Sequence, residues 1–384
     1  MTHAGVRLAL IGQKGFPATY GGVERHVEEL AVRLADRGYH TCVYNRPHYN
    51  RSAPSVYRGV EIVTLPSVPT KHLDAITHVA VCTAHALRHG ADIVHYHAVG
   101  PALLSWVPRL CDVGAVVTAH ARDWQRPKWG SLASAALRAG EWMAMHAPDE
   151  TIVVSQSLAH ELSEKHGRPA HYVPNGISLE AGGDTTILGE LGLEPEKYVL
   201  FASRLVPEKG AHYLAEAWRR QNGGMKLVMA GDSSFSDDYV LGLHAACAND
   251  SIVFPGYVYG PRLATLFRNA ALFVLPSDVE GLPIVLLEAL GYGTPVLASD
   301  IPPNREVLGD LGRTFRAGNV EDLQGQLAVA LHDLPALHDQ SRVAAAWVAE
   351  AYDWDAITDQ TVALYETVLA ARRARRQRSA PAAP

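Results

Sequence analysis

The chain has 384 residues, of which 48% are hydrophobic and 19% are charged, and its formal net charge is −6. A length of this kind predicts two domains of roughly 150–200 residues, because a single hydrophobic core rarely grows larger. The acidic balance provides no bulk basic field of the kind that attracts nucleic acid. We therefore expect no nucleic-acid partner.

The four cysteines are far apart and lack the paired spacing of a zinc site; they are Cys42, Cys82, Cys111 and Cys247. Free thiols suit a reducing compartment. The sequence has no apolar stretch of about 18 residues, and its first residues do not follow the charged-then-apolar pattern of a signal peptide. We expect a cytoplasmic protein.

The first part of the chain predicts a β-α-β unit. An apolar run, Val6 to Gly12, reads as a strand, and the loop GQKGFPATYGG leads from it into a helix. Gly38 ends this helix, and His40 to Tyr44 forms the next strand. The helix has apolar residues at the spacing of one face, namely Val23, Val27, Leu30, Ala31 and Leu34.

The glycines of this first loop do not predict a dinucleotide site. Gly15, Gly21 and Gly22 lack the spacing G-x-G-x-x-G, and no acidic residue ends the second strand. The adjacent pair Gly21 and Gly22 has two interpretations: the backbone approaches a ligand closely there, or the chain makes a tight turn before the helix.

The strand and helix alternation continues with strands at 60–65, 92–97, 115–120 and 151–155. This pattern predicts a doubly wound parallel sheet. The strand at 115–120 ends at His120 and is followed by the polar and aromatic segment ARDWQRPKWG. Open α/β sheets bind ligands at this edge. His120 is either a ligand-contacting residue or a histidine of the core.

The joint between the domains is predicted by turn residues that follow Tyr172-Val-Pro-Asn-Gly176. We place a first domain at 1–180, a linker at 181–196 and a second domain at 197–353. Strands at 198–203, 226–230, 252–255, 272–275 and 296–298 predict a second sheet of the same type.

Two cations follow the first strand of the second domain. Arg204 and Lys209 belong to the segment SRLVPEKG, in the loop and at the start of the next helix. At the carboxyl edge of a sheet such a pair suits a diphosphate. The alternative is a pair of exposed surface charges.

The segment Ser277 to Pro295, SDVEGLPIVLLEALGYGTP, predicts a strand end, a loop and a helix that starts near Pro283. The free N–H groups and the positive dipole end of such a helix favour a phosphate. Glu280 precedes the helix, and Glu288 lies more than a turn inside it, where a carboxylate accepts hydrogen bonds from hydroxyls. An ordinary buried helix with two incidental acids is the alternative.

The run from Glu280 to Glu288, E-G-L-P-I-V-L-L-E, resembles the Glu-x7-Glu motif of retaining glycosyltransferases of family 4, and the resemblance covers nearly the whole chain. It implies the GT-B fold, in which two Rossmann-like doubly wound parallel-sheet α/β domains face a cleft. A C-terminal helix, here 354–377, crosses back to the first domain. The resemblance also implies transfer from a nucleotide diphosphate-sugar donor without a metal or another cofactor.

The same resemblance assigns roles in donor binding. Arg204 and Lys209 bind and neutralise the leaving nucleotide diphosphate, Glu280 holds the hydroxyls of the sugar, and Glu288 holds the ribose. Other donor contacts are expected at Gly22, Gly231, Val258, Tyr259, Gly281 and Leu282. Generic turns after strands would look similar at Gly231 and at Val258 with Tyr259.

The segment after His120 resembles the H-G-x-D/E-W segment of bacterial enzymes that make surface polysaccharides and include rhamnosyltransferases, with Ala121 in place of the usual glycine. By this resemblance His120 contacts the donor sugar near the reacting carbon and joins Arg204, Lys209 and Glu280 as a catalytic residue. The acceptor, a glycan, a lipid-linked molecule or a small molecule, is expected at Tyr20, Arg25, Arg122, Asp123, Trp124 and Lys128.

Two further segments, 353–355 and 372–378, are not expected to bind a metal or a substrate. Asp353-Trp-Asp355 has the Asp-x-Asp pattern of metal-bound sugar nucleotides, but it opens the last helix, where Asp is a common N-cap. The arginine-rich end, 372–378, is expected to be a solvated tail. Peripheral contact with an anionic membrane, at the inner face, is the alternative.

The function predicted from the sequence is a retaining glycosyltransferase of surface polysaccharide or glycoconjugate biosynthesis. Two alternatives use the same fold: a nucleotide-sugar epimerase or hydrolase, and a non-catalytic nucleotide-sugar sensor. Acceptor-dependent release of nucleotide distinguishes transfer from both. The base, the sugar and the acceptor stay open.

Overall fold

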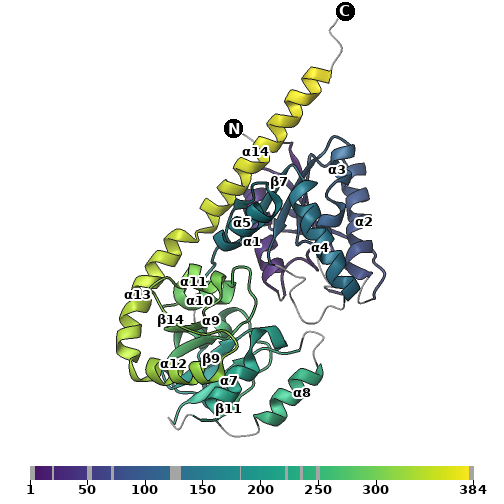
Figure 1. Ribbon diagram of the computed structural model, residues 1–384. Helices are drawn as coiled ribbons and strands as arrows, with labels where there is room; N and C mark the ends of the chain where they lie inside the picture. The colour runs from purple at the N-terminus through teal and green to yellow at the C-terminus, as the bar shows by residue number, and fades with distance from the viewer. Residues whose placement is uncertain are drawn as a thin grey trace, which may run out of the picture. The chain divides into compact units, whose positions relative to one another are not determined.

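The computed structural model describes residues 5–19, 21–49, 54–70, 73–121, 131–181, 183–220, 224–233, 237–247 and 251–379. The chain divides into two compact α/β units, Met1–Asn175 with Trp354–Pro384, and Gly176–Asp353 (Figure 1). The stretch 181–196, expected as a linker, lies within the second unit. It contains helix α6 (Thr186–Glu190), which is held in place because Ile187 and Leu188 are buried.

The first unit is built on an eight-stranded sheet in the order β3-β4-β2-β1-β5-β6-β7-β8. All strand pairs are parallel except that of β3 with β4. The strands are β1 (Arg7–Ile11), β2 (His40–Asn45), β3 (Val56–Tyr57), β4 (Val60–Thr64), β5 (Ile93–His97), β6 (Gly114–Ala119), β7 (Glu150–Val153) and β8 (His171–Tyr172). Strands β3 and β8 are absent from the prediction because two residues show no periodicity.

Helices cover both faces of this sheet, which explains why β5 and β6 are buried along their whole length. The helices are α1 (Gly22–Asp36), α2 (Asp74–Arg88), the 3-10 helix η1 (Pro101–Leu104), α3 (Val107–Leu110), α4 (Ser131–His146), α5 (Gln156–His166) and α14 (Trp354–Ser379). On α1 the predicted apolar face is buried at Val27, Leu30 and Leu34. Leu30 and Leu34 share a core cluster with Tyr365 of α14.

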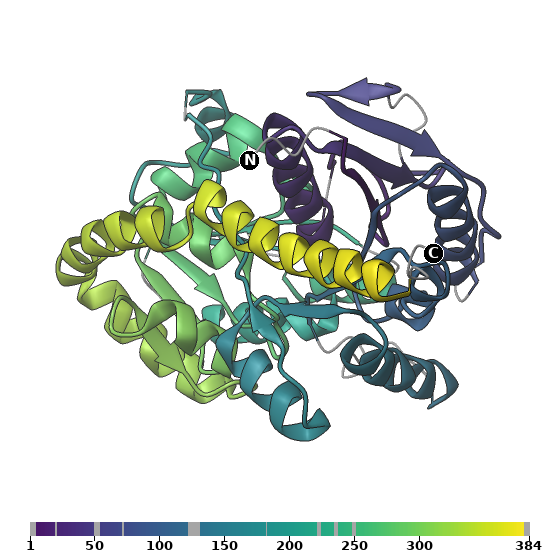
Figure 2. The ribbon, with the colours of Figure 1, turned by 90° about the horizontal axis from the view of Figure 1, so that it is seen from above.

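Helix α14, yellow in Figure 2, packs on α1 and β6 and so returns the end of the chain to the first unit. Asp355, from the Asp-x-Asp pattern, lies in its first turn. The Asp355 carboxylate pairs with Arg33 of α1 at 3.6 Å and with Arg37, the C-cap of α1, at 3.1 Å. This acid therefore joins two helices of the first unit.

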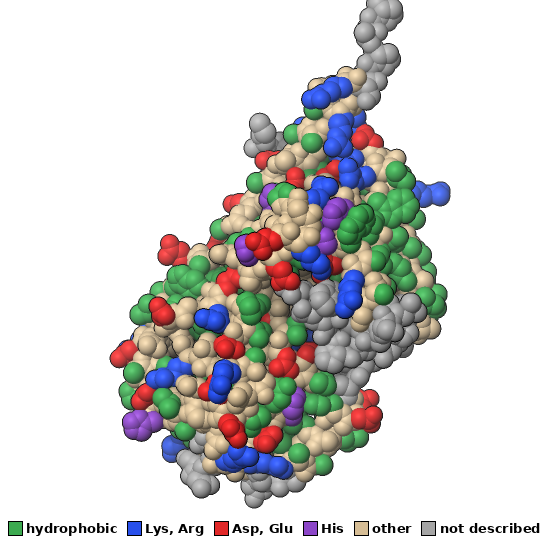
Figure 3. Space-filling model, viewed as in Figure 1, with side chains coloured by type: hydrophobic (Ala, Val, Ile, Leu, Met, Phe, Trp, Pro, Cys, Tyr) green, Lys and Arg blue, Asp and Glu red, His purple; other side chains and the backbone are tan. Residues whose placement is uncertain are grey.

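The prediction of a solvated tail at 372–378 is wrong for Arg372, whereas Arg373, Arg375 and Arg378 are exposed as expected. The helix runs through this stretch, and Arg372 is only 5% exposed, because it donates to Asp149 at 2.7 Å and lies 3.4 Å from Asp112. Arg376 also pairs with Asp112. Figure 3 shows Lys and Arg side chains over this end of α14. None of the described helices is long and apolar enough to cross a membrane.

The second unit has a six-stranded parallel sheet in the order β11-β10-β9-β12-β13-β14. Its strands are β9 (Tyr198–Ala202), β10 (Lys226–Ala230), β11 (Ile252–Val253), β12 (Leu272–Leu275), β13 (Val296–Ser299) and β14 (Arg313–Phe315). The order is that of a Rossmann sheet, with the reversal between β9 and β12. The predicted doubly wound α/β fold is confirmed for both units.

The helices of the second unit enclose this sheet around a core that includes Phe201, Leu214 and Leu272. Besides α6 they are the 3-10 helix η3 (Pro207–Lys209), α7 (Ala211–Trp218), α8 (Asp237–Ala246), α9 (Gly260–Arg268), α10 (Ile284–Gly291), α11 (Pro302–Leu308), α12 (Val320–His332) and α13 (Leu334–Ala351). The reversal of strand order leaves the loops after β9 and β12 next to each other at one edge.

Replacing Arg372 with alanine should destabilise the first unit, because the Asp149 carboxylate would lose its closest cationic partner in a buried place. Among the described residues, the Asp149 carboxylate would keep the Ala115 N–H at 3.0 Å and Arg109 at 3.5 Å. Breaking a buried ion pair costs about 3 kcal/mol or more, which lowers the melting temperature of a unit of this size by about 6–12 °C. Differential scanning calorimetry measures this change.

Arg373→Ala is the matched control, since Arg373 is exposed on the same turn of α14. It should change stability by less than about 0.5 kcal/mol. Equal melting temperatures for the two variants would show that the Arg372 ion pair does not hold the helix.

Candidate active site

The loops after β9 and β12 place three predicted residues at the topological switch point of the second unit. Arg204 lies two residues after the end of β9, and Lys209 ends η3. Gly210 follows with a left-handed φ of 69°, and a Cβ there would lie 2.0 Å from the carbonyl oxygen of Pro276, the residue after β12. Only glycine lets the two loops approach this closely.

Lys209 and Glu280 contact each other across these loops. The Nζ of Lys209 lies 2.5 Å from Oε1 of Glu280, and their side chains are 13% and 8% exposed. The backbone N–H of Asp278 donates to the carbonyl of Glu208 at 3.0 Å and fastens the same loops together. The structure thus brings the predicted cation and the first predicted acid into one ion pair.

Helix α10 begins at Ile284 with Pro283 as its N-cap, one residue before the helix itself. The Pro283 carbonyl accepts from the N–H groups of Leu286 and Leu287, at 3.0 and 3.3 Å. Glu288 lies in the second turn and is 3% exposed. Gly281 and Leu282, also predicted donor contacts, are buried just before the helix. Glu280, the acid of the ion pair, therefore lies four residues before the first residue of the helix.

The other predicted donor contacts lie at the ends of β10 and β11. A Cβ on Gly231 would lie 1.8 Å from the carbonyl oxygen of Ser203, so this glycine packs beside Arg204. Its N–H donates to the carbonyl of Gly256 at 2.8 Å. Val258 is partly buried, whereas Tyr259 is 47% exposed and caps helix α9. The structure groups Gly231 with Arg204, and Val258 with Tyr259 in the loop after β11.

Sequence reasoning missed an acidic group next to Glu280. Asp278 accepts from the hydroxyl of Tyr213 at 3.2 Å, and burial raises its pKa. The nearby carboxylate of Glu208, 4% exposed, adds to this rise. The position of Asp278, two residues before Glu280, was the available signal.

In the first unit, two acids of α1 hold the loop that follows β1 at Lys14 and at Ala18. The Glu24 carboxylate accepts from the N–H of Lys14 at 3.0 Å, and that of Glu28 from the N–H of Ala18 at 2.7 Å. Gly22 is the first residue of α1, where amides lack an acceptor within the helix. Arg25 lies in the same first turn, and its side chain is partly buried.

His120 follows β6 directly and belongs to a cluster of imidazoles. His97 is the last residue of the neighbouring strand β5, and its Nδ1 lies 3.3 Å from Nε2 of His120. The ring of His26, on α1, lies 4.7 Å from that of His120, and its Nδ1 is 2.8 Å from Oδ1 of Asn175. Burial lowers the pKa of His26 to about 4 and those of His97 and His120 well below 6.5. All three are neutral near pH 7.

His26, His97 and Asn175 were not predicted as site residues. The available signal was that His97 and His120 end adjacent predicted strands. The acceptor residues expected at Tyr20, Arg122, Asp123, Trp124 and Lys128 lie outside the described residues.

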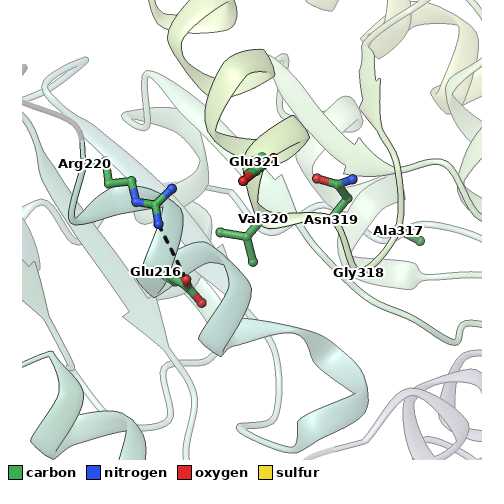
Figure 4. Close-up of a pocket in the computed structure, with 7 residues that line it drawn as sticks. All are labelled: Glu216, Arg220, Ala317, Gly318, Asn319, Val320 and Glu321. Atoms are coloured by element: carbon green, nitrogen blue, oxygen red, sulfur yellow. Dashed lines mark ion pairs between the residues drawn. The ribbon is translucent and has the colours of Figure 1, made fainter.

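A hollow of about 520 Å³ lies elsewhere on the second unit, between α7 and the start of α12 (Figure 4). Its lining includes an ion pair of Glu216 with Arg220 at 3.9 Å and a second acid, Glu321. Among the described residues that line it, none is a predicted site residue. Its paired charges and extra acid do not suit a phosphate.

Both units match known families. Residues 20–181 match Glycosyltransferase Family 4, and residues 185–347 match Glycosyl transferases group 1. The chain is 26% identical to alpha-maltose-1-phosphate synthase of Mycolicibacterium smegmatis, over 95% of this chain and 100% of that protein.

Solved structures share the fold. Sucrose-phosphate synthase from Thermosynechococcus elongatus superposes with a TM-score of 0.83 at 21% identity, covering 95% of this chain and 100% of that one. The Anabaena protein HepE, in complex with UDP and glucose, gives a TM-score of 0.78 at 20% identity, covering 94% of this chain and 100% of that one.

The fold and the two family matches define the class of protein, a glycosyltransferase with the GT-B fold. Within that class, the chain belongs to the glycosyltransferases of family 4, as the motif from Glu280 to Glu288 predicted.

Gly210→Ala should lower the free energy of unfolding of the second unit by more than the cost of placing an alanine in a left-handed conformation. An alanine in that conformation costs about 1–2 kcal/mol, and forcing the Cβ away from Pro276 adds about 1–3 kcal/mol. The matched control is Gly293→Ala, where φ is 74° and no heavy atom lies within 4 Å of the added Cβ. Urea unfolding of both variants measures the difference, and equal losses would contradict the close approach of the loops.

Proposed function

We propose that this glycosyltransferase moves a sugar from a nucleoside diphosphate donor to an acceptor hydroxyl, with retention at the anomeric carbon and without a metal ion. The observation that carries the proposal is the Lys209–Glu280 ion pair, which joins the loop after β9, where Arg204 lies, to the loop that leads into α10. A similarity supports it, because the Anabaena protein HepE has been solved with UDP and glucose.

The donor diphosphate binds to Arg204, Lys209 and the first amides of α10. Arginine offers a planar fork to phosphate oxygens, and lysine offers three donors, so Lys209 can hold Glu280 and a phosphate together. The positive end of the helix adds to this attraction. These groups neutralise the charge that develops on the leaving diphosphate.

Glu280 and Glu288 hold different hydroxyls. Glu280 lies before the helix and beside Lys209, a position that suits the donor sugar next to its diphosphate. Glu288 lies in the second turn of α10, and we assign it to the ribose. Gly231, Val258 and Tyr259 lie at neighbouring strand ends and border the nucleotide.

The proposed chemistry uses the donor's own phosphate as the base. The bond from the anomeric carbon to the phosphate oxygen breaks, and the acceptor oxygen bonds to that carbon on the same face. The acceptor proton passes to the leaving phosphate oxygen, so no protein nucleophile takes part. His120, as a neutral imidazole, contacts the sugar near the reacting carbon.

The acceptor is proposed to bind at the first unit, next to Arg25 and the segment after His120. A glycan or a lipid-linked molecule would place the enzyme in surface polysaccharide or glycoconjugate biosynthesis, at the cytoplasmic face of a membrane. The exposed arginines of α14, Arg373, Arg375 and Arg378, would support contact with anionic lipid.

Removing the charge of Glu280 or of Glu288 should have different effects. Glu280→Gln should lower kcat strongly and leave the affinity for the free nucleoside diphosphate unchanged or tighter, because Lys209 loses its anionic partner. Glu288→Gln should weaken both the sugar nucleotide and the free nucleotide, since both contain the ribose. The loss of such a hydrogen bond costs about 1.5–3 kcal/mol, or roughly 10- to 150-fold in affinity.

Calorimetry with a panel of nucleoside diphosphates and steady-state kinetics with their sugars measure these effects. Glu216→Gln, an acid on α7 outside the proposed site, is the control and should change neither quantity. If Glu280→Gln weakened the free nucleotide while Glu288→Gln spared it, the two roles would be interchanged.

Chelators should leave transfer intact, because Arg204 and Lys209 supply the positive charge that a metal supplies in other sugar-nucleotide enzymes. The measurement is the initial rate of acceptor-dependent nucleotide release before and after dialysis against EDTA. A full loss of rate that manganese restores would contradict metal-independent transfer.

A further inference from the structure

Three histidines of the first unit come together from three elements. His26 lies on α1, His97 ends β5 and His120 follows β6. One nitrogen from each ring lies within 4.8 Å of the others. His26 and His97 are buried, and His120 is partly exposed. Residues far apart in the sequence thus place three potential metal ligands in one small region.

One edge of this triangle already has the dimension of a zinc site. Zinc binds imidazole nitrogens at about 2.0–2.1 Å in tetrahedral geometry, which separates two ligand nitrogens by about 3.4 Å. The distance from Nδ1 of His97 to Nε2 of His120 is 3.3 Å. The farthest pair, within 4.8 Å, would have to approach by about 1.4 Å at most, which lies within the reach of a ring rotation.

The rings are in the chemical form that a metal requires. The Asn175 Oδ1 accepts a hydrogen bond from Nδ1–H of His26, so Nε2 of His26 carries the lone pair. Fixing one ring nitrogen with a second partner is the usual arrangement of metal-binding histidines. Among the described residues, Nε2 of His26 is buried without a hydrogen-bond partner, and so is Nε2 of His97, the other ring nitrogen from the one that faces His120.

A fourth histidine, His95, lies beside this cluster and has a purely structural role. The ring of His95 lies 4.2 Å from that of His97. Its Nδ1 lies 2.6 Å from the hydroxyl of Tyr365, and its Nε2 lies 2.7 Å from that of Thr118. His95 therefore has both nitrogens occupied, unlike His26 and His97.

We infer that His26, His97 and His120 form a binding site for one Zn²⁺ ion. Three imidazoles are a ligand set that zinc accepts, with its fourth position open to water or another small ligand on the partly exposed side of His120. Asn175 orients His26 from behind, and Trp354 packs on the same ring at a centroid distance of 5.5 Å.

A bound zinc ion would inhibit transfer. It would take a ring nitrogen of His120, which the proposed function assigns to the donor sugar, so this consequence rests on that function. Zinc would then be a regulator or an inhibitor and not a cofactor, in keeping with the proposal that transfer does not need a metal. Zinc binding itself does not depend on the reaction.

Spectroscopy of the full-length, tag-free protein tests the site directly. After dialysis against EDTA, Co²⁺ should give the intense visible absorption of tetrahedral cobalt, and one equivalent of Zn²⁺ per chain should abolish it. His26→Gln and His97→Gln should lose this signal, because glutamine is a poor zinc ligand. Asn175→Ala should weaken zinc binding roughly 10- to 100-fold, as expected for a partner behind a ligand.

The matched control is His95→Gln, which alters a buried histidine of the same cluster and should keep one zinc site. Thermal melting checks that each variant is folded, and His26→Gln should fold because glutamine can still donate to Asn175. Absence of the cobalt signal in the wild-type protein, or its persistence in His97→Gln, would overturn the site. Zinc binding without loss of transfer would instead refute the inhibitory consequence and the role assigned to His120.

Discussion

In each unit, a loop glycine packs against the backbone carbonyl at the end of a neighbouring strand. The approach is too close for any residue that has a Cβ. A Cβ on Gly12 would lie 2.3 Å from the carbonyl oxygen of His97, and one on Gly210 would lie 2.0 Å from that of Pro276. Gly12 follows β1, and Gly210 lies in the loop after β9, so each glycine lies at the reversal of strand order in its sheet. This close approach draws functional side chains from separate strands together.

The two switch points use different electrostatics. In the second unit, Lys209 and Glu280 are opposite charges in a largely buried place, and their pairing offsets the cost of removing both from water. In the first unit, His97 and His120 are neutral because burial disfavours the imidazolium form and no carboxylate adjoins them among the described contacts. The switch point of the second unit therefore presents charged side chains, whereas that of the first unit presents neutral imidazoles.

The sequence predicted what depends on local pattern and missed what depends on distant contacts. Buried strands such as β10 and β12 were predicted with their observed bounds, because parallel strands covered on both faces are continuous apolar runs. The contacts of His26 with Asn175, and of Arg372 with Asp149, join residues 149 and 223 positions apart. No periodicity shows such pairs, so a buried arginine looked like part of a solvated run.

Because the two switch points differ in charge, their side chains have different roles in the proposed reaction. A neutral His120 can exchange hydrogen bonds with a sugar hydroxyl, but it cannot balance the charge of a departing diphosphate. That charge must be met by groups that stay cationic, and arginine keeps its proton at any physiological pH. Arg204 and Lys209 therefore carry the electrostatic part of the proposed mechanism, whereas His120 contributes position and hydrogen bonding. The same cluster of imidazoles also offers ring nitrogens to a metal ion, which the proposed reaction does not use.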